Sequence, residues 1–427
     1  MKVLVVGGGG REHALLWALK RDGLARTLFA APGNPGTALL ATNLTIPATA
    51  LDDLVQATIR QKIDLVIVGP EAPLAAGLAD RLRAAGVAVF GPGAAAARIE
   101  ASKAYAKDLM TRAEVPTARS RTFTDAAAAR AYLLAHPEPV VVKASGLAAG
   151  KGAVVCATRA EAATVAEEML RGSLGDAGKE VVVEDFLEGE ELSVLALTDG
   201  ERVLILPPAQ DHKRVGEGDT GPNTGGMGAY TPVGLATPAL LARVRREVLQ
   251  PTLRQLAADG APYTGVLYAG LMVAPDGTPN VLEFNCRFGD PETQALLPAL
   301  PEGFTAHLAA IAAGGWRPDR DTIDPAGAAV TTVLAAEGYP DRPRPGAAIM
   351  LPDDWPADQL LFHAGTVRTH DGVLRVSGGR VLNVTGLGAT IAEAAARSRA
   401  GAERVRFDGM HWRRDIAWRE IARAGAP

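Results

Sequence analysis

The sequence predicts an α/β protein that begins with a doubly wound parallel sheet and ends with a small α+β region. Two observations support this fold class. Apolar runs alternate with helical stretches over residues 2–91, as in repeated β-α-β units. From residue 328 onwards the pattern becomes rich in strands. A chain of 427 residues also has the length of about two to four domains.

Composition narrows the classes of function. Hydrophobic residues make up 48% of the chain and the formal net charge is −4, so nothing favours a nucleic-acid partner. The two cysteines, Cys156 and Cys286, lie far apart, which indicates a reducing compartment. No apolar run approaches the ~18 residues of a membrane span, and the N-terminus has the pattern of a buried strand. We therefore expect a cytoplasmic protein with no membrane partner.

The first region is expected to alternate strands and helices. Its strands are predicted at residues 2–6, 26–31, 63–69 and 87–91, and its helices at residues 11–20, 51–61 and 74–85. Glycine-containing turns follow the strand ends. Because open α/β sheets bind ligands at the carboxyl ends of their strands, these turns are candidate ligand contacts.

The turn after the first strand has the chemistry of a phosphate site. Gly9 and Gly10 begin a helix, where free backbone N–H groups bind anions, and Arg11 and Glu12 follow them. A similar turn with Pro70–Glu71 follows the third strand. The alternative is that the glycines serve only helix–strand packing. A nicotinamide dinucleotide site is disfavoured, because the glycines do not fit G-x-G-x-x-G/A and the second strand ends without an acidic residue.

Two lysines and a glycine-rich hairpin mark the next region. Ser102 begins a helix together with Lys103, and a later strand ends at Lys143. A lysine that points inward from a strand needs an anionic partner, so we expect an anionic group or ligand beside Lys143. The hairpin after it is able to fold over phosphates through its backbone N–H groups, and its candidate residues are Gly146, Gly150, Lys151 and Gly152. A plain β-hairpin is the alternative.

An acidic hairpin follows at residues 181–197. Glu184 lies at the end of a strand and is followed by Phe186 and Leu187, whose backbone is free to meet the edge of an adenine. A second acid, Glu191, lies where it would reach ribose hydroxyls. Taken alone, the segment is equally an ordinary acidic hairpin on the surface.

Residues 210–232 form a long polar and glycine-rich stretch without regular periodicity. Structureless stretches of this length within a compact domain are usually functional. Asn223 and Thr224 are flanked by glycines, which suit close backbone approach to a small substrate. His212 has the chemistry of a base, but a hydrogen-bonded loop histidine is the better interpretation.

The stretch from residue 281 to 293 carries the sharpest pattern. Side chains alternate between the two faces of a strand, so Glu283, Asn285 and Arg287 share one face. The oxygens of Glu283 and Asn285 suit Mg²⁺, and the guanidinium of Arg287 suits a phosphoryl group. Phe284, Cys286 and Phe288 share the other face, so Cys286 is expected to be structural. The alternative is an amphipathic strand with one solvated face.

Together these segments resemble the phosphoribosylamine–glycine ligase family of the ATP-grasp superfamily. The resemblance covers essentially the whole chain, and its most specific parts are GPNTGGMGA and EFNCRFGDPE. It implies a Rossmann-like N-terminal domain at residues 1–101, an ATP-grasp domain at residues 102–327 and an α+β C-terminal domain at residues 328–427. A lid subdomain is expected at residues 118–190.

The resemblance also implies an activity. The family joins glycine to 5-phosphoribosylamine in de novo purine biosynthesis, cleaves ATP to ADP and phosphate, and passes through a glycyl phosphate. ATP would be the co-substrate, Mg²⁺ or Mn²⁺ the metal, and the substrates the only partners of a monomer. This reaction needs neutralised charge and positioning more than a covalent nucleophile, which agrees with the residue types described above.

The expected site residues follow from the same match. We expect Arg287, Lys143 and Asp211 to carry the chemistry, and Glu283 and Asn285 to bind the metal. The nucleotide would contact Lys103, Lys143, Gly146, Gly150, Lys151, Gly152, Glu184, Phe186, Leu187 and Glu191. The other substrates would contact Gly9, Gly10, Arg11, Glu12, Pro70, Glu71, Asn223, Thr224, Gly226, Met227, Arg287 and Asp290.

One position departs from the wider superfamily. Many ATP-grasp enzymes carry a further metal-binding glutamate on the preceding strand, where this chain has Leu271, so the ligands of a second metal stay open. Two rival functions are another ATP-grasp carboxylate–amine ligase of purine metabolism and a catalytically inactive nucleotide-binding regulator. The intact set of Lys143, Glu283, Asn285 and Arg287 argues against the regulator.

Overall fold

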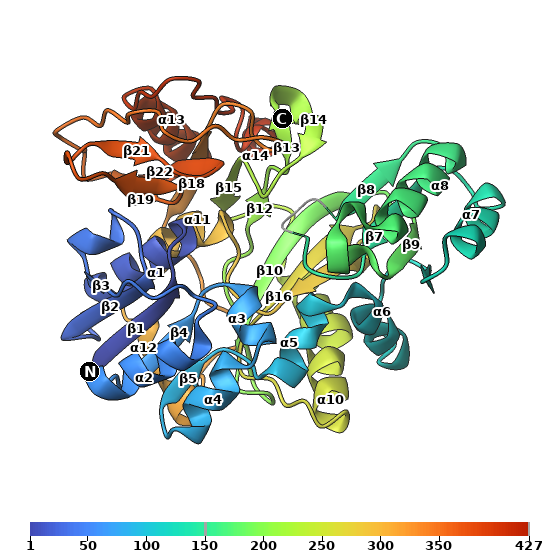
Figure 1. Ribbon diagram of the computed structural model, residues 1–427, viewed down its shortest axis with the longest axis horizontal. Helices are drawn as coiled ribbons and strands as arrows, with labels where there is room; N and C mark the ends of the chain where they lie inside the picture. Colours follow the sequence, from blue (N-terminus) through green and yellow to red (C-terminus); the bar gives the residue numbers. More distant parts are fainter. Residues whose placement is uncertain (149–151, 426–427) are drawn as a thin grey trace.

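The N-terminal region is built on a five-stranded sheet in which every pair of neighbouring strands is parallel. The computed structural model describes residues 1–148 and 152–425 of the chain (Figure 1). In spatial order the strands are β3 (Thr42–Asn43), β2 (Thr27–Pro32), β1 (Lys2–Gly7), β4 (Leu65–Val68) and β5 (Ala88–Phe90). The apolar runs are buried on both faces, which confirms the predicted doubly wound sheet.

The helices predicted at residues 11–20 and 51–61 are confirmed, and the region also contains helical segments that the sequence did not predict. In chain order the helical segments are α1 (Gly10–Arg21), the 3₁₀ turn η1 (Thr37–Leu39), α2 (Leu51–Gln61), α3 (Glu71–Ala75), α4 (Leu78–Ala84) and α5 (Ala94–Ala101). The single helix predicted at residues 74–85 is wrong, because the chain breaks between α3 and α4. Gly77 takes the left-handed conformation there, with φ of +87°, and ends the first helix.

The lid is a separate antiparallel sheet with its own small core. Its strands, in spatial order, are β6 (Ser120–Phe123), β9 (Val181–Asp185), β7 (Val140–Ala144) and β8 (Ala153–Cys156). One face is covered by α7 (Ala126–Leu134), α8 (Arg159–Glu168) and the turns η2 (Met169–Ser173) and η3 (Gly175–Gly178). Runs of valine in β7 and β9 suit this half-buried pleated surface. In Figure 1 the lid stands out on the right of the molecule.

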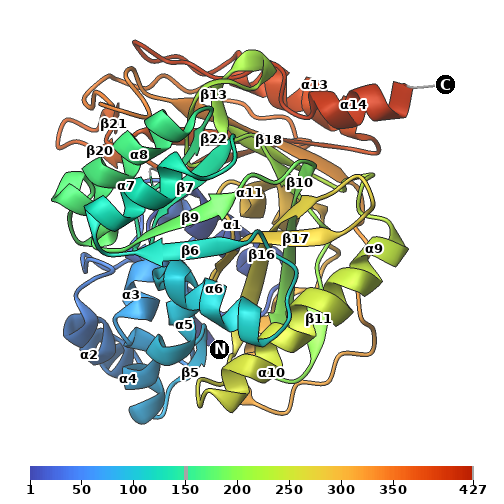
Figure 2. The same ribbon diagram turned by 90° about the vertical axis from the view of Figure 1, so that its right-hand side faces the viewer.

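A second four-stranded sheet lies between the lid and the N-terminal region (Figures 1 and 2). Its antiparallel strands are β11 (Val203–Ile205), β10 (Glu190–Thr198), β16 (Gly265–Val273) and β17 (Pro279–Asn285). The helix α6 (Lys103–Arg112) begins at Ser102, whose hydroxyl caps it by accepting from the N–H of Tyr105 at 3.2 Å. The remaining helices are α9 (Pro238–Arg243), η5 (Val244–Leu249), α10 (Gln250–Ala258), α11 (Glu292–Ala299) and α12 (Thr305–Ala313).

The C-terminal region is α+β as predicted, but its main sheet is not separate from the rest. In spatial order the sheet contains β12 (Gln210–Asp211), β15 (Gly228–Thr231), β18 (Ala328–Ala335), β22 (Arg380–Gly388) and β19 (Gln359–His363). Its first two strands come from the glycine-rich stretch of the central region. The other elements are η4 (Glu217–Asp219), the hairpins β13 (Arg214–Gly216) with β14 (Thr220–Asn223) and β20 (Thr366–Arg368) with β21 (Leu374–Val376), and the helices α13 (Ile391–Ala402) and α14 (Trp418–Gly425).

The main hydrophobic cores join the regions to one another. One core combines Val66 of β4 and Leu109 of α6 with Leu271 of β16, Phe284 of β17 and Val330 of β18. The central sheet is therefore packed against both the N-terminal and the C-terminal regions. Within residues 1–148 and 152–425, no helix has the length and apolar character that a bilayer crossing requires.

Candidate active site

A cavity of about 470 Å³ lies where the lid, the central sheet and the N-terminal region meet. It is lined by residues from all of these parts and by Arg380 of β22. The predicted site residues on its wall are Arg11, Glu71, Lys103, Lys143, Gly152, Glu184, Phe186, Leu187, Glu191, Asp211, Asn223, Thr224, Glu283, Asn285, Arg287 and Asp290. Most of the residues singled out from the sequence are thus brought together in one place.

Strand β17 presents its polar residues to the cavity as the alternation predicts. Glu283 pairs with Gly270 of β16, which has no side chain to cover the carboxylate. Phe284 and Cys286 are each 2% exposed and lie in the core. Burial alone would raise the pKa of Glu283, but the charges of Lys213 and Lys103 outweigh burial and lower it. Glu283 is therefore an ionised hard-oxygen donor next to the amide of Asn285, which is a suitable pair for a divalent cation.

The structure also shows why β16 supplies no further metal ligand. Leu271 is fully buried and pairs with Val281, on the core face of the sheet. On β16, Gly270 beside Glu283 has no side chain, and the cavity-lining Met272 has no side-chain oxygen. The hydroxyl of Tyr268, which also lines the cavity, is engaged with Ser193 and Glu292. Among the described residues no group of three or more histidine, cysteine, aspartate or glutamate side chains is arranged to hold a metal. A cation here would complete its shell with phosphate oxygens and water.

Lysines line the lid end of the cavity. Lys143 is buried, as predicted, and its anionic partner is Glu184, with Nζ 3.0 Å from Oε2. Lys143 also donates to the carbonyl oxygen of Leu282 at 2.9 Å. Lys107 lies 3.3 Å from the other oxygen of Glu184 and donates to Thr117 at 2.7 Å. The sequence did not assign a role to Lys107.

Burial shifts the pKa of two lysines at this end, Lys107 and Lys103. Burial lowers the pKa of Lys107 to about 8, against the opposing charge of Glu184. Burial also lowers the pKa of Lys103, and the nearby charge of Lys143 adds to the shift while Glu283 opposes it. Each of these ammonium groups would be stabilised by an additional anion in the cavity.

The hairpin after β7 is described only in part. The predicted contacts Gly150 and Lys151 lie outside the described residues. Gly146 packs so tightly that a Cβ there would lie 2.7 Å from the Cα of Ala177, so only glycine fits. Gly152 lines the cavity and is followed by β8.

The predicted nucleotide end continues along the connection from β9 to β10. Phe186 and Leu187 line the cavity, and Phe186 is 39% exposed. Glu191 also lines it and pairs with Lys213, whose Nζ lies 2.7 Å from Oε2 of Glu191. Oε1 of Glu184 accepts no hydrogen bond within the described chain, although the ammonium of Lys107 lies 3.3 Å from it.

The N-terminal end is built from arginines that each have an acidic partner. Nε of Arg11 lies 2.7 Å from Glu12, and its NH1 donates to the carbonyl oxygen of Phe288 at 2.9 Å. NH2 of Arg287 lies 2.8 Å from Glu100, and its Nε lies 3.3 Å from Glu71. Both arginines are therefore held in fixed orientations at the cavity wall.

Several predicted contacts at this end do not reach the cavity wall. Glu12 folds back so that its Oε2 accepts from the N–H of Gly9 at 2.6 Å, which occupies part of the expected anion site. Gly10 is buried, and a Cβ on it would lie 2.5 Å from amide nitrogens of Asn383 and Gln294. Pro70 precedes α3 outside the cavity, whereas Glu71 lines it. Phosphate binding at Gly9 and Gly10 stays a prediction.

Two residues at this end were missed from the sequence. Glu100, on α5, accepts from the N–H of Cys286 at 2.7 Å with one oxygen and pairs with Arg287 through the other. Arg380, on β22, lies 3.4 Å from a carboxylate oxygen of Asp290 and donates to the carbonyl oxygen of Asp290 at 2.7 Å. Neither lies in a distinctive motif, because each was an ordinary charge in a helix or strand pattern.

The glycine-rich stretch reaches the cavity at Asp211 and Lys213 and again at residues 223–225. Asp211 lines the wall, and burial raises its pKa to about 7 while Lys213 opposes the shift. Asn223 and Thr224 line the wall as predicted. His212 is 1% exposed and its Nε2 accepts from the N–H of Ala417 at 2.9 Å, so the interpretation as a bonded loop histidine is confirmed.

The predicted contacts at Gly226 and Met227 are not supported by the structure. Met227 is fully buried in the core, and its N–H and carbonyl are both engaged in backbone hydrogen bonds with His212 and Val333. A Cβ on Gly226 would lie 2.4 Å from Pro291, so this glycine permits close packing instead. The glycine-rich stretch has no periodicity, and the sequence therefore did not distinguish its packed residues from its exposed ones.

The lid sheet and the central sheet, closing on lysines and on hard-oxygen donors between them, define the ATP-grasp class of ATP-dependent ligases. Family models confirm this class and narrow it. They match residues 1–100 to the phosphoribosylglycinamide synthetase N domain, residues 101–293 to its ATP-grasp (A) domain and residues 329–419 to its C domain. The chain belongs to the phosphoribosylglycinamide synthetase family.

Individual relatives agree with this assignment. The chain is 47% identical over 433 residues to the phosphoribosylamine–glycine ligase of Agrobacterium fabrum, covering 100% of both. The crystal structure of the Thermotoga maritima phosphoribosylamine–glycine ligase has a TM-score of 0.86 and 36% identity, covering 98% of this chain and 100% of that one.

A more distant structure shares only the fold. The biotin carboxylase domain of the Hydrogenobacter thermophilus 2-oxoglutarate carboxylase, in complex with MgADP, ADP and bicarbonate, has a TM-score of 0.72 and 18% identity, covering 96% of this chain and 91% of that one. Enzymes of the ATP-grasp class use ATP with a divalent metal, and the chain is an enzyme of this ligase class.

Proposed function

We propose that this protein joins glycine to 5-phosphoribosylamine, with cleavage of ATP to ADP and phosphate, in de novo purine biosynthesis. The observation that supports the proposal most strongly is the convergence of Lys143, Glu283 and Arg287 on one cavity in a chain of this family. The relatives that match over their full length carry the name of this ligase.

The first chemical step would activate glycine. A carboxylate oxygen of glycine attacks the γ-phosphorus of ATP, the bond from that phosphorus to the bridging oxygen breaks, and ADP leaves with the electron pair. Lys103 and Lys143 would hold the phosphates, and Arg287 would stabilise the charge that develops on the transferred group. The adenine amino group would donate to the carboxylate of Glu184, and the ribose would bind at Glu191.

The second step would form the amide bond. The amine nitrogen of 5-phosphoribosylamine attacks the carbonyl carbon of glycyl phosphate, and the bond to the phosphate oxygen breaks. The nitrogen then loses a proton, and Asp211 is our candidate acceptor because burial raises its pKa to about 7. Arg11, Glu71 and Asp290 would position the phosphoribosyl group at the other end of the cavity.

We propose Mg²⁺ or Mn²⁺ as the metal, held by Glu283 and Asn285. The cation would supply charge neutralisation for the phosphate oxygens. We also propose that the protein acts as a monomer.

The decisive experiment is an ADP-release assay with each substrate omitted in turn. We expect ADP release only when glycine and 5-phosphoribosylamine are both present, and glycinamide ribonucleotide as the product. Equal ADP release with another amino acid in place of glycine would point to the rival carboxylate–amine ligase of purine metabolism. Release that needs neither substrate would contradict the proposal.

A further inference from the structure

Arg413 is the largest fully buried side chain of the protein, with 1% exposure. Its guanidinium uses nearly all of its donors. Nε and NH2 donate to the two oxygens of Asp415 at 2.8 and 2.7 Å, and NH1 donates to Asp219 at 2.9 Å and to the carbonyl oxygen of Arg214 at 3.0 Å. A buried guanidinium is expensive unless it is paired in this way. Arg413 therefore ties the C-terminal tail, residues 413–425, to the β13–β14 hairpin.

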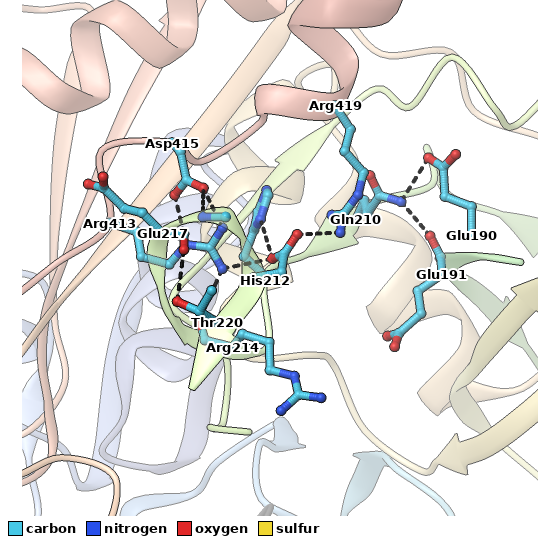
Figure 3. A network of polar contacts seen from close by, with 12 residues as sticks. Glu190, Glu191, Gln210, His212, Arg214, Glu217, Thr220, Arg413, Asp415 and Arg419 are labelled. Atoms are coloured by element: carbon cyan, nitrogen blue, oxygen red, sulfur yellow. Dashed lines mark hydrogen bonds and ion pairs between the residues drawn. The ribbon is translucent and has the colours of Figure 1, made fainter. Parts of the chain in front are cut away.

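The tip of the same hairpin is held by neighbouring residues of the tail (Figure 3). Asp415 accepts from the N–H of Gly218 at 2.8 Å, and Glu217 accepts from the N–H of Arg414 at 3.0 Å. Asp219 also pairs with Arg419, in the first turn of the last helix, α14. Since each contact joins the tail to residues 217–219, the tail fixes the hairpin as a unit.

The tail also reaches the beginning of β10. Arg423 pairs with both oxygens of Glu190, at 2.7 and 2.9 Å. Gln210 donates from Nε2 to Glu190 at 3.1 Å and to the carbonyl oxygen of Glu191 at 2.6 Å (Figure 3). The backbone on either side of Glu191 is thus connected to the tail independently of the hairpin.

These two attachments meet at the cavity. Lys213 directly precedes β13, and Glu191 lies at the start of β10. Their side chains pair at 2.7 Å on the cavity wall. Burial opposes the charge of Lys213, but Glu191 and Asp211 outweigh burial and raise its pKa, so the ammonium of Lys213 is charged. The position of this ion pair depends on the two backbones that the tail holds.

We propose that Arg413 is a positioning residue for the nucleotide site. By fixing the β13–β14 hairpin it holds Lys213 against Glu191, and so it sets the orientation in which Glu191 meets the ribose. The inference rests on the proposed binding of the nucleotide at Glu191. Within the described residues, the hydrogen bonds of Arg413 go to Asp415, Asp219 and Arg214, none of which lines the cavity, so it acts through the hairpin.

Arg413→Lys is the informative substitution. A lysine keeps the charge but cannot form the planar fork that contacts Asp415, Asp219 and the carbonyl of Arg214 at once. We expect the Kd for ADP, measured by calorimetry with Mg²⁺, to rise about tenfold. Asp219→Asn, which removes the acidic side of the contact and leaves Asp415 in place, should raise the Kd in the same direction.

Two controls separate positioning from general loss of structure. Arg414→Lys changes the neighbouring exposed residue, whose guanidinium lies 4.9 Å from the centre of the Trp412 ring, and should leave the Kd for ADP unchanged. In a Lys213→Met background, Arg413→Lys should change the Kd by less than about twofold, because the pathway through Lys213 is already broken. The melting temperature of every variant is measured in parallel.

The outcomes are distinct. An unchanged Kd for ADP in folded Arg413→Lys and Asp219→Asn variants would overturn the inference, and so would an equal effect of Arg413→Lys with and without Lys213. The inference is supported if Arg413→Lys raises the Kd for ADP in the wild-type background but not in the Lys213→Met background. If the variants show these changes in the Kd for ADP but the wild-type protein releases no ADP with glycine and 5-phosphoribosylamine, only the proposed function is contradicted.

Discussion

The two ends of the cavity bury positive charge in opposite ways. At the lid end, Lys107 and Lys143 share the single carboxylate of Glu184. At the N-terminal end, every arginine of the wall has an acid of its own: Arg11 with Glu12, Arg287 with Glu100 and Glu71, and Arg380 with Asp290. One end is therefore short of negative charge, and the other is already neutralised.

The pKa values express the same contrast. Burial lowers the pKa of Lys107 to about 8, because its charge is not fully compensated. Burial would also lower the pKa of Arg287, but Glu100 and Glu71 outweigh burial and raise it. The lysines at the lid end lack enough negative charge, so a bound polyanion such as ATP stabilises them most. The acids around Arg287 hold its guanidinium in place for a group that gains charge only during the reaction.

The largest effect is expected on the strand between the two ends. Glu283→Ala removes the only carboxylate of the proposed metal pair, and turnover should fall at least about 1000-fold because metal stabilisation of the transferring group is worth several kcal/mol. The assay is ADP release in Mg²⁺. Binding of 5-phosphoribosylamine should fall far less, and near-normal turnover would contradict the metal assignment.

At the N-terminal end of the cavity, where each arginine is paired with an acid, a substitution should lower kcat. Arg287→Lys should lower kcat by about 100-fold to 1000-fold, since a point charge cannot replace the fork that Glu100 and Glu71 orient. The Kd for ADP should stay within about twofold of the wild type, because this residue is proposed to act on the transferred group. A variant with normal kcat and weakened ADP binding would show that Arg287 acts with the lysines at the lid end of the cavity.

A substitution at Arg11 tests binding at the same end. Arg11→Ala should raise the KM for 5-phosphoribosylamine about tenfold, through loss of a charge-assisted contact with its phosphate. Initial rates at saturating ATP and glycine give this value. If only the KM for ATP changed, the phosphoribosyl group would have to bind elsewhere.

The smallest expected effect is the pH dependence of ADP affinity at the lid end of the cavity, where Lys107 lies. Below pH 8, Lys107 is charged with or without nucleotide, so the affinity for ADP should be flat. Above pH 8 the free protein has lost this proton and must regain it to face a phosphate. The affinity should then fall, by up to about tenfold per pH unit. Calorimetry from pH 7 to 9 measures this slope, which Lys107→Met should abolish; an equal slope in that variant would assign the proton elsewhere.

Local patterns accounted for the parts of the site that lie within one strand or one turn. The placement of Glu283 and Asn285 on one face of β17, with Phe284 and Cys286 in the core, follows from the two-residue period of a strand. The buried Lys143 was recognisable for the same reason, because a charge in an apolar strand needs a partner. These features depend on neighbours in sequence.

Partners that are distant in sequence were not predictable. Glu100 meets the N–H of Cys286 across 186 residues, and nothing near Glu100 in the sequence marks it. Arg380 reaches Asp290 from a strand of the C-terminal region, in which the sequence predicted no site residue. Met227 was misplaced because a glycine-rich stretch does not reveal which of its residues enter the core.

The sheet shared between the central and C-terminal regions has a consequence for how the protein forms. Strand β15 finds its partner, β18, only after the chain has continued past residue 327, and β12 in turn depends on β15. Such pairings between distant segments form late in folding. During synthesis, the wall that carries Asp211 and Lys213 is therefore completed only once the C-terminal region has emerged. A ribosome-bound chain that lacks this region would have a folded N-terminal sheet and no competent active site.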